Sequence, residues 1–271
     1  MEKTNEKTDY LSLLEARRYD PKKIPEKEEI IFTIQDKIIG TLQNYVVISG
    51  QAKAGKSTYI SAIIASAFLP EFQDNFGIKL KTPKNRPKIG YIDTESSNYD
   101  FCGQMVRIRN FALKNSHPGN LDAYSLRGDS PKKIKLLIIE YLKANPQTSI
   151  LVVDGFLDLC LDYNSETETR QLTNWFKKIT ADYNILLIGV LHLSKGSGET
   201  LGHLGSNTDR WAQSTLLVEK NKELRQFILK SKFLRSADDF DPICLMNFNG
   251  KLQQMPYTEP IKITNNKPPK K

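Results

Sequence analysis

The chain has 271 residues, of which 39% are hydrophobic and 26% charged, and its formal net charge is +8. This length suits one large α/β domain with short extensions, and no apolar run approaches the ~20 residues that span a bilayer. The polar start MEKTNEKTDY does not resemble a secretory signal, and the three cysteines lack metal-ligand spacing. We therefore expect a cytoplasmic protein that makes no membrane contact.

Residues 1–29 are predicted to be an extension, residues 30–255 the main domain, and residues 256–271 a disordered basic tail. Within the extension, residues 10–19 have a modest apolar face, which predicts one helix that docks on the same subunit or on a neighbour. Residues 30–34 alternate weakly between apolar and polar, which predicts a strand leading into the core.

The excess positive charge favours binding of a polyanion. It gathers in three groups, which are Lys79, Lys81, Lys84, Arg86 and Lys88, then Lys220, Lys222, Arg225, Lys230, Lys232 and Arg235, and finally Lys267, Lys270 and Lys271. The alternative is that these side chains lie on solvated loops.

An apolar run at residues 45–48 ends in GQAKAGKST, which matches the phosphate-loop pattern G-x-x-x-x-G-K-[ST] without a mismatch. In such a loop, backbone N–H groups and a helix N-terminus point at one anion, and the glycines permit the sharp turn. We expect Lys56 to reach the β- and γ-phosphates of ATP and the Ser57 hydroxyl to ligate Mg²⁺. The expected nucleotide contacts are Gly50, Gln51, Ala52, Lys53, Ala54, Gly55, Lys56, Ser57 and Thr58. The alternative is an ordinary glycine turn between a strand and a helix that Pro70 ends.

Polar side chains follow three further apolar strands, and parallel strands place such ends at one edge of a sheet. The segment KIGYIDTESS delivers Glu95, a candidate to polarise the water that attacks the γ-phosphate, although Thr94 or Ser96 capping a helix is an alternative. The segment SILVVDG ends with Asp154, which would hold Mg²⁺ beside the loop hydroxyl. A third strand, residues 185–191, is followed by His192, which is either structural or placed to sense the γ-phosphate.

The other segments complete an α/β pattern. Residues 71–88 are expected to form an irregular or hairpin insertion, and residues 156–167 an acidic, polar loop. Residues 194–209 are rich in glycine and small polar residues, which predicts a mobile functional loop or a long connector. Helices are expected at residues 99–114 and 131–144 and around Leu172, Trp175, Phe176 and Ile179, and strands at residues 121–126, 214–218, 226–230 and 243–248. The last three strands predict an antiparallel addition to one sheet edge.

The segments GQAKAGKST, YIDTESS, ILVVDG, LLIGVLHLSKG and GHLGSNTDRWAQSTLLVEK resemble the RecA-like P-loop ATPases, in particular the plasmid-type RepA hexameric replicative helicases. The DnaB and KaiC proteins are more distantly similar. The likeness covers about residues 30–250 and implies a doubly wound, mostly parallel sheet, a hexameric ring, and ATP bound between subunits.

By this resemblance, Glu95 is the catalytic glutamate, Asp154 the Mg²⁺ aspartate and His192 the γ-phosphate sensor. Residues 194–209 correspond to the loop that faces single-stranded DNA in the channel of the ring, with Lys195 and His203 as its candidate contacts.

The resemblance also implies a catalytic contribution from the neighbouring subunit. The family places basic residues of a neighbour at the γ-phosphate, on a late strand with a Lys-x-Arg pattern. Here residues 227–235 offer Lys230 with Lys232, or Lys232 with Arg235, and Arg210 is a further alternative.

We therefore expect a ring-forming DNA helicase or translocase that serves replication or mobilisation of a plasmid or mobile element. A regulatory or partner-loading ATPase that switches with nucleotide, or a structural subunit with feeble hydrolysis, is the alternative.

Overall fold

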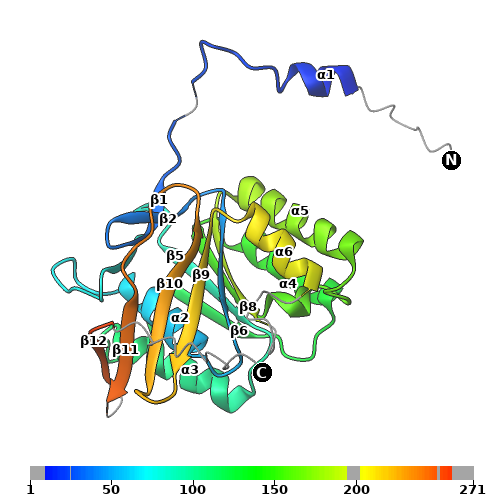
Figure 1. The fold of residues 1–271 in the computed structure, drawn as a ribbon. Helices are drawn as coiled ribbons and strands as arrows, with labels where there is room; N and C mark the ends of the chain where they lie inside the picture. The colour runs from blue at the N-terminus through cyan, green and yellow to red at the C-terminus, as the bar shows by residue number, and fades with distance from the viewer. Residues whose placement is uncertain (1–9, 25, 194–201, 249–250, 258–271) are drawn as a thin grey trace, which may run out of the picture.

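The computed structural model describes residues 10–24, 26–193, 202–248 and 251–257 (Figure 1). The N-terminal helix α1 (Tyr10–Glu15) stands apart from the sheet in Figure 1, and all of its residues are exposed. It is shorter than the predicted helix over residues 10–19. Most of the predicted tail lies outside the described residues.

The body is built on a sheet of nine strands in the order β12-β11-β10-β9-β3-β8-β7-β5-β6. Its parallel part contains β3 (Tyr45–Gly50), β5 (Lys88–Asp93), β6 (Leu121–Ser125), β7 (Thr148–Asp154), β8 (Leu186–His192) and β9 (Ser214–Asn221). The antiparallel strands β10 (Gln226–Leu234), β11 (Ile243–Phe248) and β12 (Lys251–Met255) extend it beyond β9. The α/β class is confirmed. The predicted antiparallel addition is confirmed for β10 and β11, but it is wrong for residues 214–218, because β9 pairs in parallel with β3.

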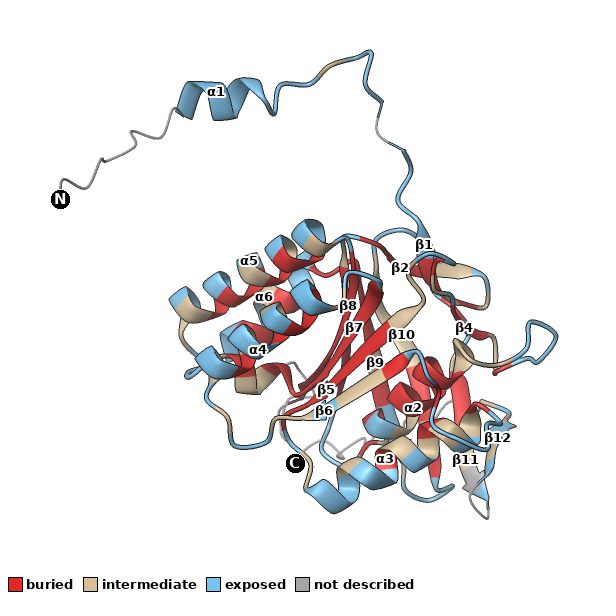
Figure 2. Cartoon of the chain, turned by 180° about the vertical axis from the view of Figure 1, so that it is seen from behind, coloured by how far each residue is buried: buried red, intermediate tan, exposed pale blue. Residues whose placement is uncertain are grey.

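Helices cover both faces of this sheet, as Figure 2 shows by the buried strands between two helical layers. One layer contains α2 (Lys56–Ser66) and α3 (Asn98–Phe111), and the other contains α4 (Pro131–Ala144), α5 (Glu166–Tyr183) and α6 (Gly202–Trp211). In β3, Val46 and Ile48 pack in the core on the α2 side, whereas Tyr45 and Val47 pack on the α5 side. Because β3 is buried on both faces, its sequence is a continuous apolar run, and this run predicts the strand.

The order of the strands explains the two layers. The chain moves outward from β3 to β5 and β6, and it then returns through β7 and β8 to β9. Because crossover connections are right-handed, this reversal puts the later helices on the opposite face. The neighbours β3 and β8 therefore send their connections to opposite faces, and open α/β sheets bind ligands at the carboxyl ends of such a strand pair.

Two predicted segments form a second sheet instead of joining the core strands. The strands β1 (Ile30–Ile34), β2 (Lys37–Thr41) and β4 (Ile78–Leu80) make a three-stranded antiparallel sheet in the order β2-β1-β4. The turn at Gln35 and Asp36 has positive φ at both positions, which suits a tight hairpin. The buried side chains of Phe32 and Ile34 pack in the same core cluster as α2.

The prediction of a loop over residues 194–209 is wrong for residues 202–209. Residues 202–209 belong to helix α6, and residues 194–201 lie outside the described residues. The small residues that suggested a loop let α6 lie close to α5, with Leu204 and Thr208 buried and Asn207 Nδ2 donating to Thr169 Oγ1 at 2.9 Å. The predicted loop over residues 156–167 likewise begins with a 3-10 turn, η1 (Phe156–Leu159).

Candidate functional site

The phosphate-loop sequence lies between the end of β3 and the start of α2, as predicted. Gly55 has φ 101°, a left-handed conformation, and a Cβ there would meet the Phe227 ring at 2.3 Å. A Cβ on Gly50 would lie 2.5 Å from the carbonyl oxygen of Val218. The two glycines therefore permit close contact with β9 and β10 as well as the turn itself, and these long-range contacts are not visible in the motif.

The C-terminal strands also hold the helix that follows the loop. The hydroxyl of Tyr59 lies 2.6 Å from the carbonyl oxygen of Ile243 and 2.9 Å from that of Phe227. Tyr59 is fully buried, so it joins α2 to β10 and β11. The antiparallel addition at the sheet edge thus contributes directly to the position of the phosphate loop.

Lys56 is 6% exposed, and its ammonium group has three acceptors within the chain. Nζ donates to the carbonyl oxygens of Gly50 at 2.8 Å and Gln51 at 2.9 Å, and to Nδ1 of His192 at 3.1 Å. Burial lowers the pKa of Lys56, and the nearby carboxylates of Glu95 and Asp154 oppose that effect. The strand register makes the contact with the histidine possible, because His192 of β8 pairs with Gly50 of β3.

His192 connects Lys56 to Glu95. An ammonium group can only donate, so Nδ1 accepts its hydrogen bond and Nε2 carries the ring proton. Nε2 lies 2.9 Å from Glu95 Oε2 and 3.1 Å from Oε1, so His192 donates to this carboxylate. Burial acts to raise the pKa of Glu95, but His192 and Lys56 together outweigh it and hold the pKa below its usual value. Three residues predicted from separate segments thus form one hydrogen-bonded chain.

Asp154 lies beside this chain at the end of β7, where it is 8% exposed. It pairs in register with Asp93, the other carboxylate at this sheet edge. Burial, together with the charges of Asp93 and Glu95, raises the pKa of Asp154 to about 7, while Tyr91 and Lys56 oppose the shift. A buried carboxylate with this pKa is poorly compensated by the protein alone.

The two carboxylates at the end of β5, those of Asp93 and Glu95, have different roles. Asp93 Oδ1 accepts hydrogen bonds from the backbone N–H groups of Glu95 at 3.0 Å and Ser96 at 2.7 Å, so it forms the turn that presents Glu95. The alternative in which Thr94 or Ser96 caps a helix is wrong for α3. Its N-cap is Ser97, whose hydroxyl accepts the N–H of Asp100.

Three residues contribute hydrogen bonds near the site that the sequence did not predict. Tyr91 donates to Asp154 Oδ2 at 3.0 Å, Thr94 Oγ1 donates to Asp158 Oδ2 at 2.7 Å, and Gln104 Nε2 donates to the carbonyl of Ser57 at 2.9 Å. Gln104 is buried on the inner face of α3, and a polar residue at such a position is a signal that the sequence did contain.

The site suits a hard cation. Ser57 lies in the first turn of α2, and Asp154 supplies carboxylate oxygen. The carboxylates of Glu95 and Asp154 lie near one ammonium, that of Lys56, and Asp93 adds a third negative charge beside Asp154. A divalent cation offsets such an excess. Among the described residues, no group of three or more His, Cys, Asp or Glu is arranged as a metal centre. Mg²⁺ typically takes only one or two protein ligands and completes its shell with water and phosphate.

The structure does not bring Arg235, which directly follows β10, to Lys56 of the same chain. Leu229 of β10 and Gly50 of β3 both pair with Val218 of β9, so they mark one level of the sheet. At roughly 3.3 Å per residue, Arg235 lies about 20 Å along the strand from that level. It lies toward the amino-terminal ends of the parallel strands, opposite the phosphate loop. The carboxylates of Glu219 and Asp209 bind Lys230 and Lys232, respectively, each at 2.7 Å.

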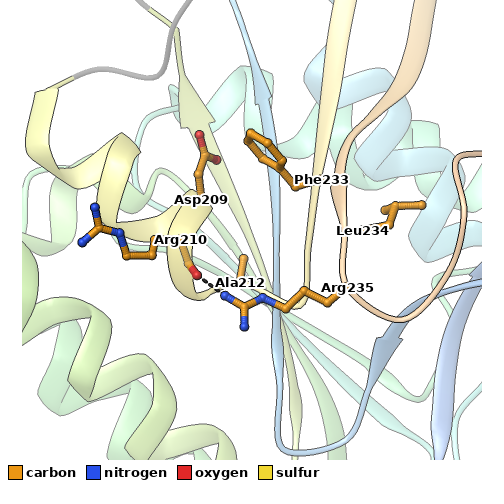
Figure 3. Close-up of a pocket in the computed structure, with 6 residues that line it drawn as sticks. All are labelled: Asp209, Arg210, Ala212, Phe233, Leu234 and Arg235. Carbon is orange, nitrogen blue, oxygen red and sulfur yellow. Dashed lines mark hydrogen bonds between the residues drawn. The ribbon is translucent and has the colours of Figure 1, made fainter.

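Arg235 and Arg210 lie together at that opposite edge. The Arg235 guanidinium donates to the carbonyl oxygen of Arg210, as Figure 3 shows. Both side chains are exposed. They line a hollow of about 380 Å³ together with Asp209, Ala212, Phe233 and Leu234.

The predicted DNA contacts divide between described and undescribed parts of the chain. His203 is exposed in the first turn of α6, and Lys195 lies outside the described residues.

No protein-family model matches this chain, and no match is found among curated proteins. None of the helices in the described residues is long and apolar enough to cross a membrane.

Proposed function

We propose that this chain is a Mg²⁺-dependent ATPase with a RecA-like fold that assembles into a ring and moves along single-stranded DNA. The observation that carries the ATPase proposal is the hydrogen-bonded chain of Lys56, His192 and Glu95 at the phosphate loop. The ring, its six subunits, the DNA substrate and a role in plasmid replication or mobilisation rest on the sequence resemblance.

The strand order supports a nucleoside triphosphatase over a dinucleotide-binding protein. In the dinucleotide fold, the strand after the glycine-rich turn lies next to the first strand, and its terminal acid binds a ribose. Here β8 and β7 lie between β3 and β5. Glu95 therefore meets His192 and Lys56 instead of the ribose side of the loop.

The chemistry follows from what each side chain can donate or accept. The three protons of Lys56 are held by two carbonyls and His192, and phosphate oxygens would replace some of these acceptors when ATP binds. Mg²⁺ would be held by Ser57 and Asp154 and would neutralise charge that develops on the phosphates. Glu95 would orient the attacking water and take its proton as the new O–P bond forms and the bond to the β-phosphate oxygen breaks.

The contacts of His192 suggest how turnover is coupled to nucleotide. Both carboxylate oxygens of Glu95 lie within hydrogen-bond distance of His192, whose other nitrogen accepts from Lys56. A phosphate that draws Lys56 away leaves Nδ1 of His192 without this donor. His192 would thus sense whether a phosphate occupies the loop and report this to Glu95.

The position of Arg235 supports assembly. It is too far along β10 to act on the phosphate loop of its own chain, so any role in hydrolysis must be in a neighbouring subunit. Of the basic candidates, Lys230 and Lys232 form ion pairs within the chain, whereas Arg235 and Arg210 are exposed beside one hollow. We assign the contribution in trans to the edge that carries Arg235.

Steady-state ATPase measurements with and without single-stranded DNA, run beside mass photometry, test this function. We expect ATP-dependent rings and turnover that DNA stimulates. Turnover without rings or DNA stimulation would favour the nucleotide-switch ATPase, which the contacts between His192 and Glu95 also fit. Absence of nucleotide binding would contradict both functions.

A further inference from the structure

Tyr91 is a buried side chain whose hydroxyl faces two carboxylates. It is fully buried in β5, and its ring stacks on Phe101 of α3 with centroids 6.3 Å apart. The hydroxyl lies 3.0 Å from Asp154 Oδ2 and 3.4 Å from Asp93 Oδ2. A phenylalanine would fill the same space, so the packing alone does not require the hydroxyl.

The hydroxyl engages only one oxygen of Asp154. Within the part of the chain that the structure describes, Oδ1 of Asp154 has no hydrogen-bond donor, while Oδ2 has Tyr91. A carboxylate held by one oxygen keeps a fixed orientation and leaves the other oxygen for a ligand. Partners of this kind orient metal ligands, and their loss typically weakens metal binding 10–100-fold.

The same hydroxyl reaches the turn that carries Glu95. Asp93 presents Oδ2 to Tyr91, and its Oδ1 accepts the backbone N–H groups of Glu95 and Ser96. Tyr91 therefore lies between the carboxylate expected to bind the cation and the turn expected to present the base.

We infer that Tyr91 is a positioning residue for the divalent cation: its hydroxyl donates to the Asp154 carboxylate and orients it, beside the turn that carries Glu95. This inference rests on the proposed ATPase function. Tyr91 touches neither nucleotide nor cation in this role, because it acts on the cation through Asp154.

The test is Tyr91→Phe, with Mg²⁺ titrated against a fluorescent, non-hydrolysable ATP analogue and Mn²⁺ binding followed by electron paramagnetic resonance. We expect Mg²⁺ to bind about 10-fold more weakly or worse, while nucleotide affinity without metal stays unchanged. Replacement of Tyr91 by 4-aminophenylalanine, which restores a donor at the same position, should recover most of the Mg²⁺ affinity. It also tests the inference if the phenylalanine variant does not fold.

Tyr141→Phe is the matched control, because Tyr141 also donates to an aspartate of this sheet, Asp122, at 3.1 Å, away from the site. It should leave Mg²⁺ binding unchanged. In an Asp154→Asn background, Tyr91→Phe should have no further effect, since both changes act on one carboxylate.

The other possible results would contradict either the inference about Tyr91 or the proposed ATPase function. Unchanged Mg²⁺ affinity in Tyr91→Phe, an equal loss in Tyr141→Phe, or additive losses with Asp154→Asn would overturn the inference and leave the ATPase proposal intact. If the wild-type protein binds no nucleotide with or without Mg²⁺, the proposed function fails and the inference fails with it.

Discussion

At the scale of single residues, substitutions of Lys56 and Glu95 are expected to affect nucleotide binding and turnover differently. Lys56→Ala should abolish nucleotide binding, because it removes the buried ammonium that the phosphate loop presents. Glu95→Gln should keep ATP binding, since glutamine can still accept from His192, but turnover should fall ~100-fold or more. Binding of a fluorescent nucleotide and steady-state ATPase assays separate the two effects. The exposed substitution Glu140→Gln is the control, and wild-type turnover in Glu95→Gln would show that Glu95 is structural.

The raised pKa of Asp154 predicts that the folding stability of the protein without nucleotide or metal depends on pH. Its pKa in the folded state is about 7, above the ordinary 3.8, so between these values the folded state binds more protons than the unfolded state. Stability should therefore fall as pH rises through this window.

The variant Asp154→Asn removes this penalty. Above pH 7 in EDTA, it should be more stable than wild type by roughly 1–4 kcal/mol, because each unit of pKa shift corresponds to about 1.4 kcal/mol. Below pH 4 the two proteins should unfold alike. Thermal unfolding from pH 3.5 to 8 measures this, with the exposed Asp238→Asn as control. An equal pH profile for Asp154→Asn and wild type would show that Asp154 is not the source.

At the scale of elements, Arg86 holds several together. It belongs to a group of basic residues considered for polyanion binding, yet its guanidinium donates to four backbone carbonyls, those of Pro146, Thr148, Tyr183 and Asn184. Two of these lie at the C-terminal end of α5, where a cation is also favoured by the helix dipole. Thr148 begins β7, the strand that delivers Asp154. Arg86 is therefore a structural residue.

We predict that Arg86→Ala lowers the free energy of unfolding by about 2–4 kcal/mol, because part-buried carbonyls lose a charged donor. Urea denaturation measures this loss. Arg86→Lys should recover only part of it, since an ammonium cannot reproduce the planar fork of donors. Lys84→Ala, an exposed change in the same segment, should cost little. If both changes cost the same, the four hydrogen bonds do not contribute as proposed.

The helix α6 shows how packing decided an element that composition did not. Its glycine, serine, threonine and asparagine residues favour loops in isolation. In the fold, Leu204 joins the core on the α5 side and Asn207 bonds to Thr169. Most helical stability in proteins comes from such tertiary contacts and not from propensity.

At the scale of the whole molecule, the separation between the phosphate loop and Arg235 predicts how subunits cooperate in an assembly. The phosphate loop and Arg235 lie at opposite edges, so one subunit cannot use both on a single nucleotide. Mixing inactive Lys56→Ala subunits with inactive Arg235→Ala subunits should therefore restore part of the ATPase activity. The intact interfaces would pair a phosphate loop from the second variant with Arg235 from the first.

Mixing Lys56→Ala with Glu95→Gln is the matched control, because both lesions lie in the same half of the interface and no mixture repairs it. Equal recovery in both mixtures would rule out a contribution in trans. Full activity of Arg235→Ala alone would remove Arg235 from the mechanism, and Lys232→Ala would then be tested in the same way.

Several parts of this protein follow from the sequence by itself. The phosphate loop, the helix after it, and the strands ending at Asp93, Asp154 and His192 are all recognisable because they depend on local spacing and on uninterrupted apolar runs. These local signals also predict that the polar strand ends share one edge of the sheet, since parallel strands all present their carboxyl ends there. The antiparallel strands that extend the sheet beyond β9 follow from the same kind of pattern.

Only the tertiary structure decided which of these groups touch. Lys56 and His192 are 136 positions apart, and they meet because β8 lies beside β3 in a register that no local pattern contains. The same holds for Tyr91 with Asp154 and for Arg86 with its four carbonyls. Hydrogen bonds of this kind depend on distance and angle between distant segments, whereas a sequence pattern reports only neighbours along the chain.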